Sequence, residues 1–244
     1  MSTPTSKRLS RRIAEFSEGL SDLERFNLNL IMSIGVGGIA PRGDVPEAGV
    51  RKDAWDTGIS VLSATGRSGV SFVGRAPFMT DDLLSGLQRE AVERKSISHR
   101  TGPQELSPGG SAAEALSRNP DAISLISDSL GEKVFPTEIS TYLYYTSGGD
   151  YLYPHVDTDI FSVNLITMLE RRVPEGKREE DASALVIYDA DANPRRVPLR
   201  VGESAVLMAS GTVHARETLA PGEKVTILTV GFQYQGLKPS DFGQ

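Results

Sequence analysis

The chain has 244 residues, a formal net charge of −6 and no cysteine. This length suits one large domain with a substantial core, and the absence of cysteine excludes disulfides and thiolate metal sites. The acidic balance argues against a general surface for nucleic acid or anionic membranes, although it leaves room for a local basic patch, and it favours a small-molecule partner. We expect one domain over 1–244, with a helical and loop extension at 1–58, a core at 59–234 and a tail at 235–244. A cytoplasmic location is compatible with the missing cysteines.

The N-terminal segment 7–34 carries apolar side chains at three- and four-residue spacings, which predicts an amphipathic helix with a break near Gly19. It lacks the apolar stretch and cleavage motif of a secretory signal, and nothing approaches a membrane-spanning length. Two interpretations stay open: a helix packed outside the domain, or a helix that forms a homodimer. Glycine, proline and charge over 35–58 predict a long loop with Trp55 as a packing anchor.

The next stretch alternates short strands, helices and loops. Residues 58–63 and 70–74 are predicted strands, and Thr80 is the predicted N-cap of a helix that ends near Lys95. The polar segment 96–110 is rich in glycine and proline, which predicts a lid or binding loop. We expect His99 and Arg100 in this loop to be surface residues, and the alternative is that they contact the substrate.

Two helices and five strands are expected in the rest of the chain. Helical turns at 111–117 precede a helix that has Asn119 as its cap, Pro120 at its first position and Gly131 after its end. Apolar and β-branched runs then predict strands at 136–145, 162–171, 184–188, 203–208 and 224–234.

A candidate metal site lies within this β-rich part. If the run around His155 and Asp157 is a strand, these two side chains point to the same face while Val156 packs on the other. His214 follows 57 residues later (214 − 157), far enough for strands to bring it back across a barrel. Two imidazoles and one carboxylate on one face of a metal leave the opposite face open, as non-heme Fe(II) oxygenases require for substrate and O₂. The alternative is a core histidine beside a solvated strand-end aspartate.

A candidate anion site follows. Lys224 stands ten residues after His214 (224 − 214) and opens an alternating run, so it shares a face with Thr226. If that face is the barrel interior, the buried ammonium demands an anion, and a 2-oxo diacid that chelates the metal fits both ends. The alternative for Lys224 is an exposed edge-strand lysine. Arg216 points the same way as His214 and could hold the anion instead of Lys224, or bind an acidic group of the substrate. The alternative for Arg216 is a salt bridge with a nearby acidic residue.

Together these residues resemble the signature of Fe(II)/2-oxoglutarate-dependent dioxygenases, in the prolyl 4-hydroxylase-like branch. The resemblance covers about 134–234. It implies a mainly β fold, a double-stranded β-helix (jelly-roll) barrel with helices packed outside, and a site that takes Fe(II), 2-oxoglutarate as cosubstrate and O₂. The lead-in from Tyr145 to His155 also resembles that branch's order of tyrosine, glycine, tyrosine and histidine. In that branch the tyrosine that begins this order helps to hold 2-oxoglutarate. It matches Tyr145 here, but the spacing is one residue longer, so Tyr144 is a competing assignment.

The resemblance also implies the reaction. We expect a hydroxylase that oxidises a small molecule, an amino acid or a natural-product intermediate, and releases succinate and CO₂. The alternatives are a peptidyl or prolyl hydroxylase with the same site, and a non-catalytic jelly-roll binding protein. Substrate selection is expected to reside in 35–58, 96–118 and 172–183, which carry no readable motif.

Overall fold

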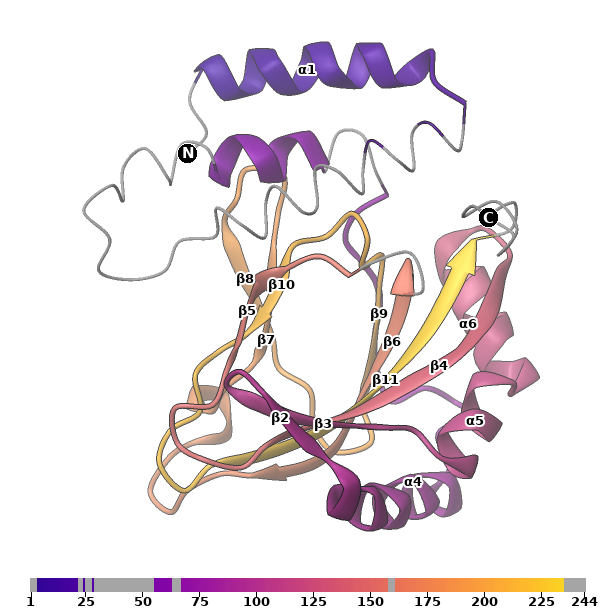
Figure 1. Ribbon diagram of the computed structural model, residues 1–244, viewed down its shortest axis with the longest axis vertical. Coiled ribbons are helices and arrows are strands. Elements are labelled where there is room, and N and C mark those ends of the chain that lie inside the picture. Colours follow the sequence, from indigo (N-terminus) through magenta and orange to yellow (C-terminus); the bar gives the residue numbers. More distant parts are fainter. Residues whose placement is uncertain are drawn as a thin grey trace.

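The computed structural model describes residues 4–21, 24, 28, 55–62, 67–157 and 161–234. Its strands form two antiparallel sheets that face each other (Figure 1). The larger sheet has the order β1 (Val70–Gly74), β9 (Ser204–Leu207), β6 (Val163–Arg172), β11 (Lys224–Tyr234), β4 (Val134–Tyr145), β3 (Gln104–Pro108) and β2 (His99–Thr101). The smaller sheet has the order β5 (Leu152–His155), β10 (His214–Arg216), β7 (Leu185–Tyr188) and β8 (Pro194–Val197). This is the predicted jelly-roll arrangement, although the described strands do not close into one continuous barrel.

Helices cover the outer face of the larger sheet (Figure 1). They are α4 (Asp81–Arg94), α5 (Ser111–Ser117) and α6 (Pro120–Leu130), with short 3-10 turns η1 (Lys95–Ile97) and η3 (Glu179–Asp181) elsewhere. The predicted caps are confirmed. The Thr80 hydroxyl accepts a hydrogen bond from the Leu83 N–H, the Asn119 side chain accepts two at the start of α6, and Gly131 ends α6 in the left-handed conformation at φ 66°.

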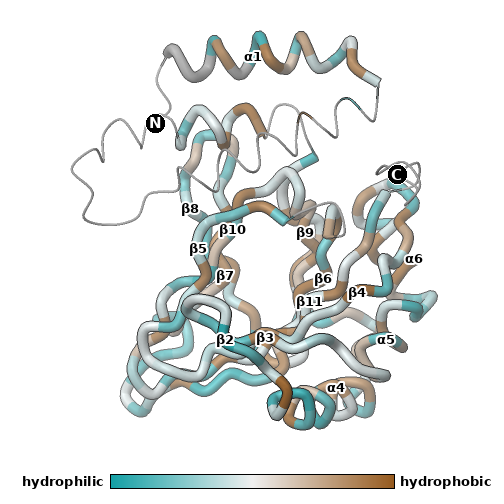
Figure 2. The backbone as a smooth tube through the Cα atoms, in the orientation of Figure 1, coloured by the Kyte–Doolittle hydropathy of each residue, from teal (hydrophilic) through white to brown (hydrophobic). Residues whose placement is uncertain are grey.

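The central strand β11 separates two apolar cores because its side chains alternate between the two faces of the sheet. Leu228, Val230 and Phe232 face α4, α5 and α6, and belong to the outer core. Val225 and Ile227 face the smaller sheet and belong to the inner core. Figure 2 shows hydrophobic segments along the central strands, and alternating hydrophilic and hydrophobic residues along α1 (Pro4–Glu18).

Two segments differ from the sequence-based expectation. Residues 55–62 are helical, where a loop and a strand were expected. Trp55, Ile59 and Leu62 are spaced as one face of a helix and are all buried, so packing selects the helix over local β propensity. The predicted loop at 96–110 contains the hairpin of β2 and β3, which is stabilised by the pairing of β3 with β4, a contact that local sequence does not reveal.

The N-terminal prediction is confirmed as far as it is described: α1 is helical and the chain turns at Gly19. The predicted continuation to residue 34, most of the loop at 35–58 and the tail at 235–244 lie outside the described residues. Among the helices that are described, none has the length and apolar character needed to cross a bilayer.

Candidate metal centre

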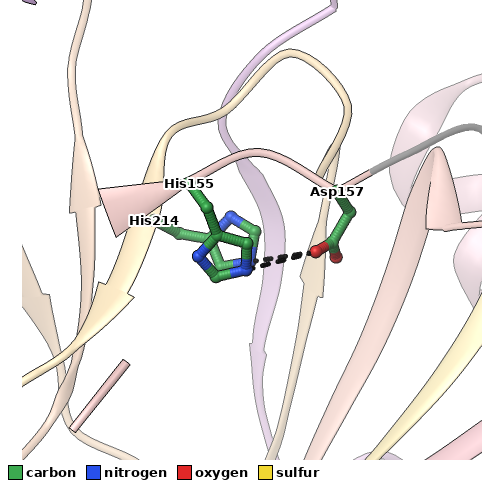
Figure 3. Close-up of side chains that lie close together, drawn as sticks. All are labelled: His155, Asp157 and His214. Carbon is green, nitrogen blue, oxygen red and sulfur yellow. Dashed lines mark ion pairs between the residues drawn. The ribbon is translucent and has the colours of Figure 1, made fainter. Parts of the chain in front are cut away.

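Three candidate ligands converge between the two sheets, at one end of the β5 and β10 pair. His155 is the last residue of β5 and His214 the first of β10, and the antiparallel register places them directly opposite each other (Figure 3). Their ring centroids are 4.3 Å apart. Asp157 follows β5 by two residues. The sequence analysis expected it within the strand, and it lies just past the end of that strand.

The three side chains can share one ion. One ligand atom from each residue lies within 4.8 Å of the others. Asp157 Oδ1 is 3.3 Å from His155 Nε2 and 3.7 Å from His214 Nε2 (Figure 3). A metal about 2 Å from each ligand atom requires separations of this size, so the group has the geometry of a two-histidine, one-carboxylate site.

Backbone carbonyls orient both imidazole rings. His155 Nδ1 lies 2.8 Å from the carbonyl oxygen of Tyr153. His214 Nδ1 lies 2.9 Å from the carbonyl oxygen of Thr212. A carbonyl only accepts, so each Nδ1 carries a proton, and Nε2 is the ring nitrogen that each histidine presents to a metal.

The carboxylate is also held in place. Asn164 Nδ2 donates to Asp157 Oδ2 at 2.8 Å, and the backbone N–H of Asp157 donates to the carbonyl of Ala209 at 3.0 Å. These bonds leave Oδ1 facing the two histidines. Sequence reasoning missed Asn164, although its position on the alternating strand at 162–171 marks it as inward-facing once the inner face is known.

Asp157 and His214 carry the charges that a metal needs, whereas His155 must give up a proton. Burial opposes protonation of His155, but the hydrogen bond with Asp157 and its charge raise the net pKa of that imidazole, so metal binding would displace a proton from His155 Nε2. Burial and the neighbouring His155 lower the pKa of His214 to about 4, so its imidazole is neutral at pH 7. Burial opposes ionisation of Asp157, but the two histidines and the Asn164 amide bring the net pKa of that carboxyl below its usual value. Asp157 is therefore a carboxylate at neutral pH.

Helix 55–62 packs behind the ligands. Val156, between the two ligands of the first strand, and Val213, which precedes His214, both contact the apolar cluster of Trp55, Ile59 and Leu62. Val156 thus packs away from the site as predicted. Helix 55–62 packs against a residue beside each candidate histidine ligand.

A cavity of about 180 Å³ extends from the ligands between the sheets. Arg216 and Tyr145 lie in its wall, and both are buried. The Arg216 guanidinium donates to the carbonyl of Ser183 at 3.3 Å and stands 5.7 Å from the centre of the Tyr145 ring. Within the described part of the chain the hydrogen bond to Ser183 is the one polar contact of the Arg216 guanidinium and no ion pair involves it, and the Tyr145 hydroxyl has no hydrogen-bond partner. Among the residues that the structure describes, the cavity therefore holds a buried cation without an ion-pair partner and a buried hydroxyl without a hydrogen-bond partner.

Comparison with solved structures bears on the fold. The sequence matches no protein-family model and no curated protein. The structure is similar to the α-ketoglutarate-dependent epimerase SnoN from nogalamycin biosynthesis, with a TM-score of 0.54, 16% identity, and coverage of 69% of this chain and 78% of SnoN. It is also similar to a prolyl-4-hydroxylase from Pseudomonas putida, with a TM-score of 0.51, 19% identity, and coverage of 72% and 98%. HygX from Streptomyces hygroscopicus, solved with nickel, 2-oxoglutarate and hygromycin B, gives a TM-score of 0.53, 12% identity, and coverage of 70% and 85%.

The chain has the fold of the Fe(II)/2-oxoglutarate oxygenases. The three candidate ligands lie between the two sheets of this fold, at the end where β5 and β10 meet. The cavity beside the ligands is enclosed between the same two sheets.

Three predicted residues lie on the other face of the larger sheet, away from the ligands. Lys224 and Thr226 do share a face, as predicted, but together with Tyr144 they line a separate cavity against α4. The Thr226 hydroxyl donates to Glu170 at 2.9 Å, and the Tyr144 hydroxyl to the carbonyl of Ala91 at 2.8 Å. The physical reason is alternation: β11 sends Val225 inward, beside Tyr145, so its neighbours must point outward. This corrects the expectation that Lys224 faces the barrel interior.

The two candidates in the predicted loop also lie elsewhere. His99 is exposed on β2 and does not line the cavity. Arg100 pairs with Asp150 at 2.6 Å, where that carboxylate also accepts two backbone hydrogen bonds in the turn after β4. Of the two tyrosines that competed for the cavity, the structure places Tyr145 in its wall.

Proposed function

We propose that this chain is an Fe(II)- and 2-oxoglutarate-dependent oxygenase that hydroxylates a small molecule. One observation carries the proposal: a metal-ligand set of two histidines and a carboxylate shares a buried cavity with an arginine that has no ion-pair partner among the described residues. The first feature suits a metal with open positions, and the second demands an anion. A 2-oxo diacid meets both needs in one molecule.

The residues present fit ferrous iron. His155 and His214 offer their Nε2 atoms and Asp157 offers one negative charge, and the three ligand atoms lie within 4.8 Å of one another. Nitrogen and carboxylate ligands with an open face are the set that non-heme Fe(II) oxygenases use. When bound, the iron would supply O₂ activation coupled to oxidative decarboxylation of 2-oxoglutarate.

Arg216 fits the far carboxylate of 2-oxoglutarate. His214 and Arg216 are two positions apart on β10, so their Cα atoms are separated by about 6.6 Å along the same face. That spacing suits a five-carbon diacid that reaches a metal with one end and a guanidinium with the other. The Tyr145 hydroxyl is available to donate a second bond, and Arg216 takes the role that the sequence assigned to Lys224.

The rest of the cavity supports oxidation of a small organic molecule. Leu143, Ile166 and Ile227 make its wall apolar, which lowers the local dielectric constant and strengthens charged contacts at both ends. Phe161 also lines the cavity, beside the ligands. A small-molecule substrate is supported by the likeness to SnoN and HygX, which were solved with nogalamycin RO and hygromycin B.

Cosubstrate turnover tests the proposal. Purified protein supplied with Fe(II), O₂ and 2-oxoglutarate should form succinate slowly without substrate and faster with it. Arg216→Ala should raise the 2-oxoglutarate requirement strongly, because it leaves a buried carboxylate unpaired. Lys224→Ala is the matched control, since it removes a cation on the opposite face and should leave that requirement unchanged.

Two results would count against the proposal. A wild-type protein that neither binds 2-oxoglutarate nor forms succinate would favour a non-catalytic binding protein. A Lys224→Ala variant that needs more 2-oxoglutarate, beside an unaffected Arg216→Ala, would return the anchor to the sequence-based assignment.

A further inference from the structure

Glu223 is a buried carboxylate that the proposed reaction does not use directly. Its side chain is 0% exposed, and it lies in the turn before β11. Oε1 accepts hydrogen bonds from both the backbone N–H and the hydroxyl of Ser183, at 2.7 and 2.6 Å. Oε2 accepts one from the N–H of Ala220 at 3.0 Å and stands 3.5 Å from the Lys177 ammonium. So complete a set of partners fixes both Glu223 and Ser183.

Ser183 connects this carboxylate to the cavity. Its N–H and hydroxyl point to Glu223, while its carbonyl accepts the hydrogen bond from Arg216. The next residue is held as well, because the N–H of Ala184 donates to Glu217 at 2.9 Å. Arg196 in turn bonds Glu217 and the carbonyl of Ala182. The segment 182–184 is therefore clamped by two glutamates, with the carbonyl that contacts Arg216 between them.

A free arginine side chain has several rotatable bonds, so an anion-binding arginine loses affinity if it must be ordered at the moment of binding. The hydrogen bond to Ser183 and the stacking on Tyr145 order Arg216 in advance. Burial opposes ionisation of Glu223, but the bonds from Ser183 and Ala220 bring its net pKa below the usual value, so it is a carboxylate at pH 7.

We infer that Glu223 is a positioning residue: through Ser183 it holds the Arg216 guanidinium in the geometry that receives the far carboxylate of a 2-oxo diacid. This inference rests on the proposed function, and it concerns selection of the cosubstrate. It implies that Glu223 sets the preference for a diacid over a 2-oxo monoacid. Glu223 should not affect how the other end of the cosubstrate binds the metal.

Two probe molecules separate these ends. 2-Oxoglutarate carries both the metal-chelating group and the far carboxylate, whereas 2-oxobutyrate carries only the first. Dissociation constants for both are measured by calorimetry on full-length, Mn(II)-loaded protein without O₂. Glu223→Gln should weaken 2-oxoglutarate roughly 10-fold, the lower end of what outer contacts around a bound group contribute, and leave 2-oxobutyrate within about 2-fold.

The control and companion variants make the result decisive. Glu180→Gln changes an exposed glutamate near the same segment and should alter neither constant. Arg216→Ala should abolish the preference for the diacid altogether. Ser183→Ala removes a single bond to Glu223, so it should shift the preference in the same direction by a smaller factor, and it replaces Glu223→Gln if that variant does not fold.

Two outcomes would overturn the inference while the proposed function stands. In one, Arg216→Ala abolishes the preference but Glu223→Gln or its replacement keeps the wild-type ratio. In the other, Glu223→Gln weakens both ligands equally, which indicates a general loss of structure. If Arg216→Ala itself retains the preference, the anchor in the proposed function is wrong instead.

Discussion

His155 and His214 stand opposite each other on adjacent antiparallel strands, with the carboxylate of Asp157 within 3.7 Å of both Nε2 atoms. Because each imidazole donates its Nδ1 proton to the carbonyl two residues before it, the strand backbone itself sets the direction of both rings. The ligand geometry is therefore built by local backbone structure on two strands.

The metal prediction follows from this arrangement. His155→Ala or His214→Ala should lower Fe(II) or Mn(II) affinity by more than about 100-fold, because even outer contacts of a metal site contribute roughly 10–100-fold. The readout is metal stoichiometry after equilibrium dialysis, together with the rise in melting temperature on adding metal. His99→Ala changes the remaining histidine, which is exposed on β2, and should bind metal normally. Normal stoichiometry in His214→Ala would refute the site.

Asn164 provides a second prediction. Its amide donates to Asp157 Oδ2 and keeps the other oxygen toward the histidines. Asn164→Ala should leave the fold intact but weaken metal binding by roughly 10–100-fold, as loss of a bond to a ligating carboxylate does. Dialysis against a metal buffer series measures this, with Ser124→Ala on the outer face of α6 as the control. Unchanged affinity would show that Asp157 is held by its backbone alone.

Acid stability depends on a different carboxylate. Glu90 of α4 is buried and accepts hydrogen bonds from the backbone of Gly110, Ala112 and Ala113 and from the Tyr142 hydroxyl. Burial opposes its ionisation, but these donors bring its net pKa below the usual 4.5. The unfolded chain then binds more protons below pH 4.5, so the stabilisation is present above that pH and is lost as the pH falls through the folded-state pKa.

Glu90→Gln tests this directly. At pH 7 the variant should lose about 1–3 kcal/mol in the free energy of unfolding, because at least one buried donor is left without an acceptor. Below pH 4.5 the difference from wild type should shrink. Urea unfolding at several pH values measures both effects, and Glu93→Gln on the exposed face of the same helix serves as the control. A difference that stays constant with pH would contradict the assignment.

The sequence predicted two of the candidate metal ligands, His155 and Asp157, and most strands because these signals are local. A His-x-Asp pair and an alternating apolar run can be read within ten residues, and the helix caps at Thr80 and Asn119 are equally local. The face of β11 could not be read in this way. Alternation places Lys224 and Thr226 together, but which face is interior depends on the register that sets Val225 beside Tyr145 on β4. Tyr145 lies 80 residues earlier (225 − 145).

The same limit explains the other differences. The β2 and β3 hairpin exists because β3 pairs with β4, and helix 55–62 exists because Trp55, Ile59 and Leu62 find Val213 to pack against. Both partners, β4 and Val213, are too far away in the sequence to be recognised from the residues around each segment. The Glu223 and Ser183 pair likewise joins residues 40 positions apart, so no motif around either residue announces it.

Tyr144 and Tyr145 allow one last, paired prediction, because adjacent residues of one strand project to opposite faces. The Tyr145 hydroxyl is buried in the cavity wall and has no hydrogen-bond partner among the described residues, so Tyr145→Phe should leave the free energy of unfolding unchanged or slightly higher. It should weaken 2-oxoglutarate by roughly 10–100-fold, the value of one hydrogen bond to a charged group.

Tyr144→Phe should do the reverse. Its hydroxyl donates to the carbonyl of Ala91 in α4, so its loss should cost about 1 kcal/mol of stability and leave 2-oxoglutarate binding unchanged. Urea unfolding measures the stability of each variant, and calorimetry measures its affinity for 2-oxoglutarate. Tyr145→Phe should lose affinity alone, and Tyr144→Phe should lose stability alone. If both variants lose cosubstrate affinity, or if Tyr144→Phe alone does, the cosubstrate lies on the helix-covered face of the sheet and the cavity beside the metal ligands serves another molecule.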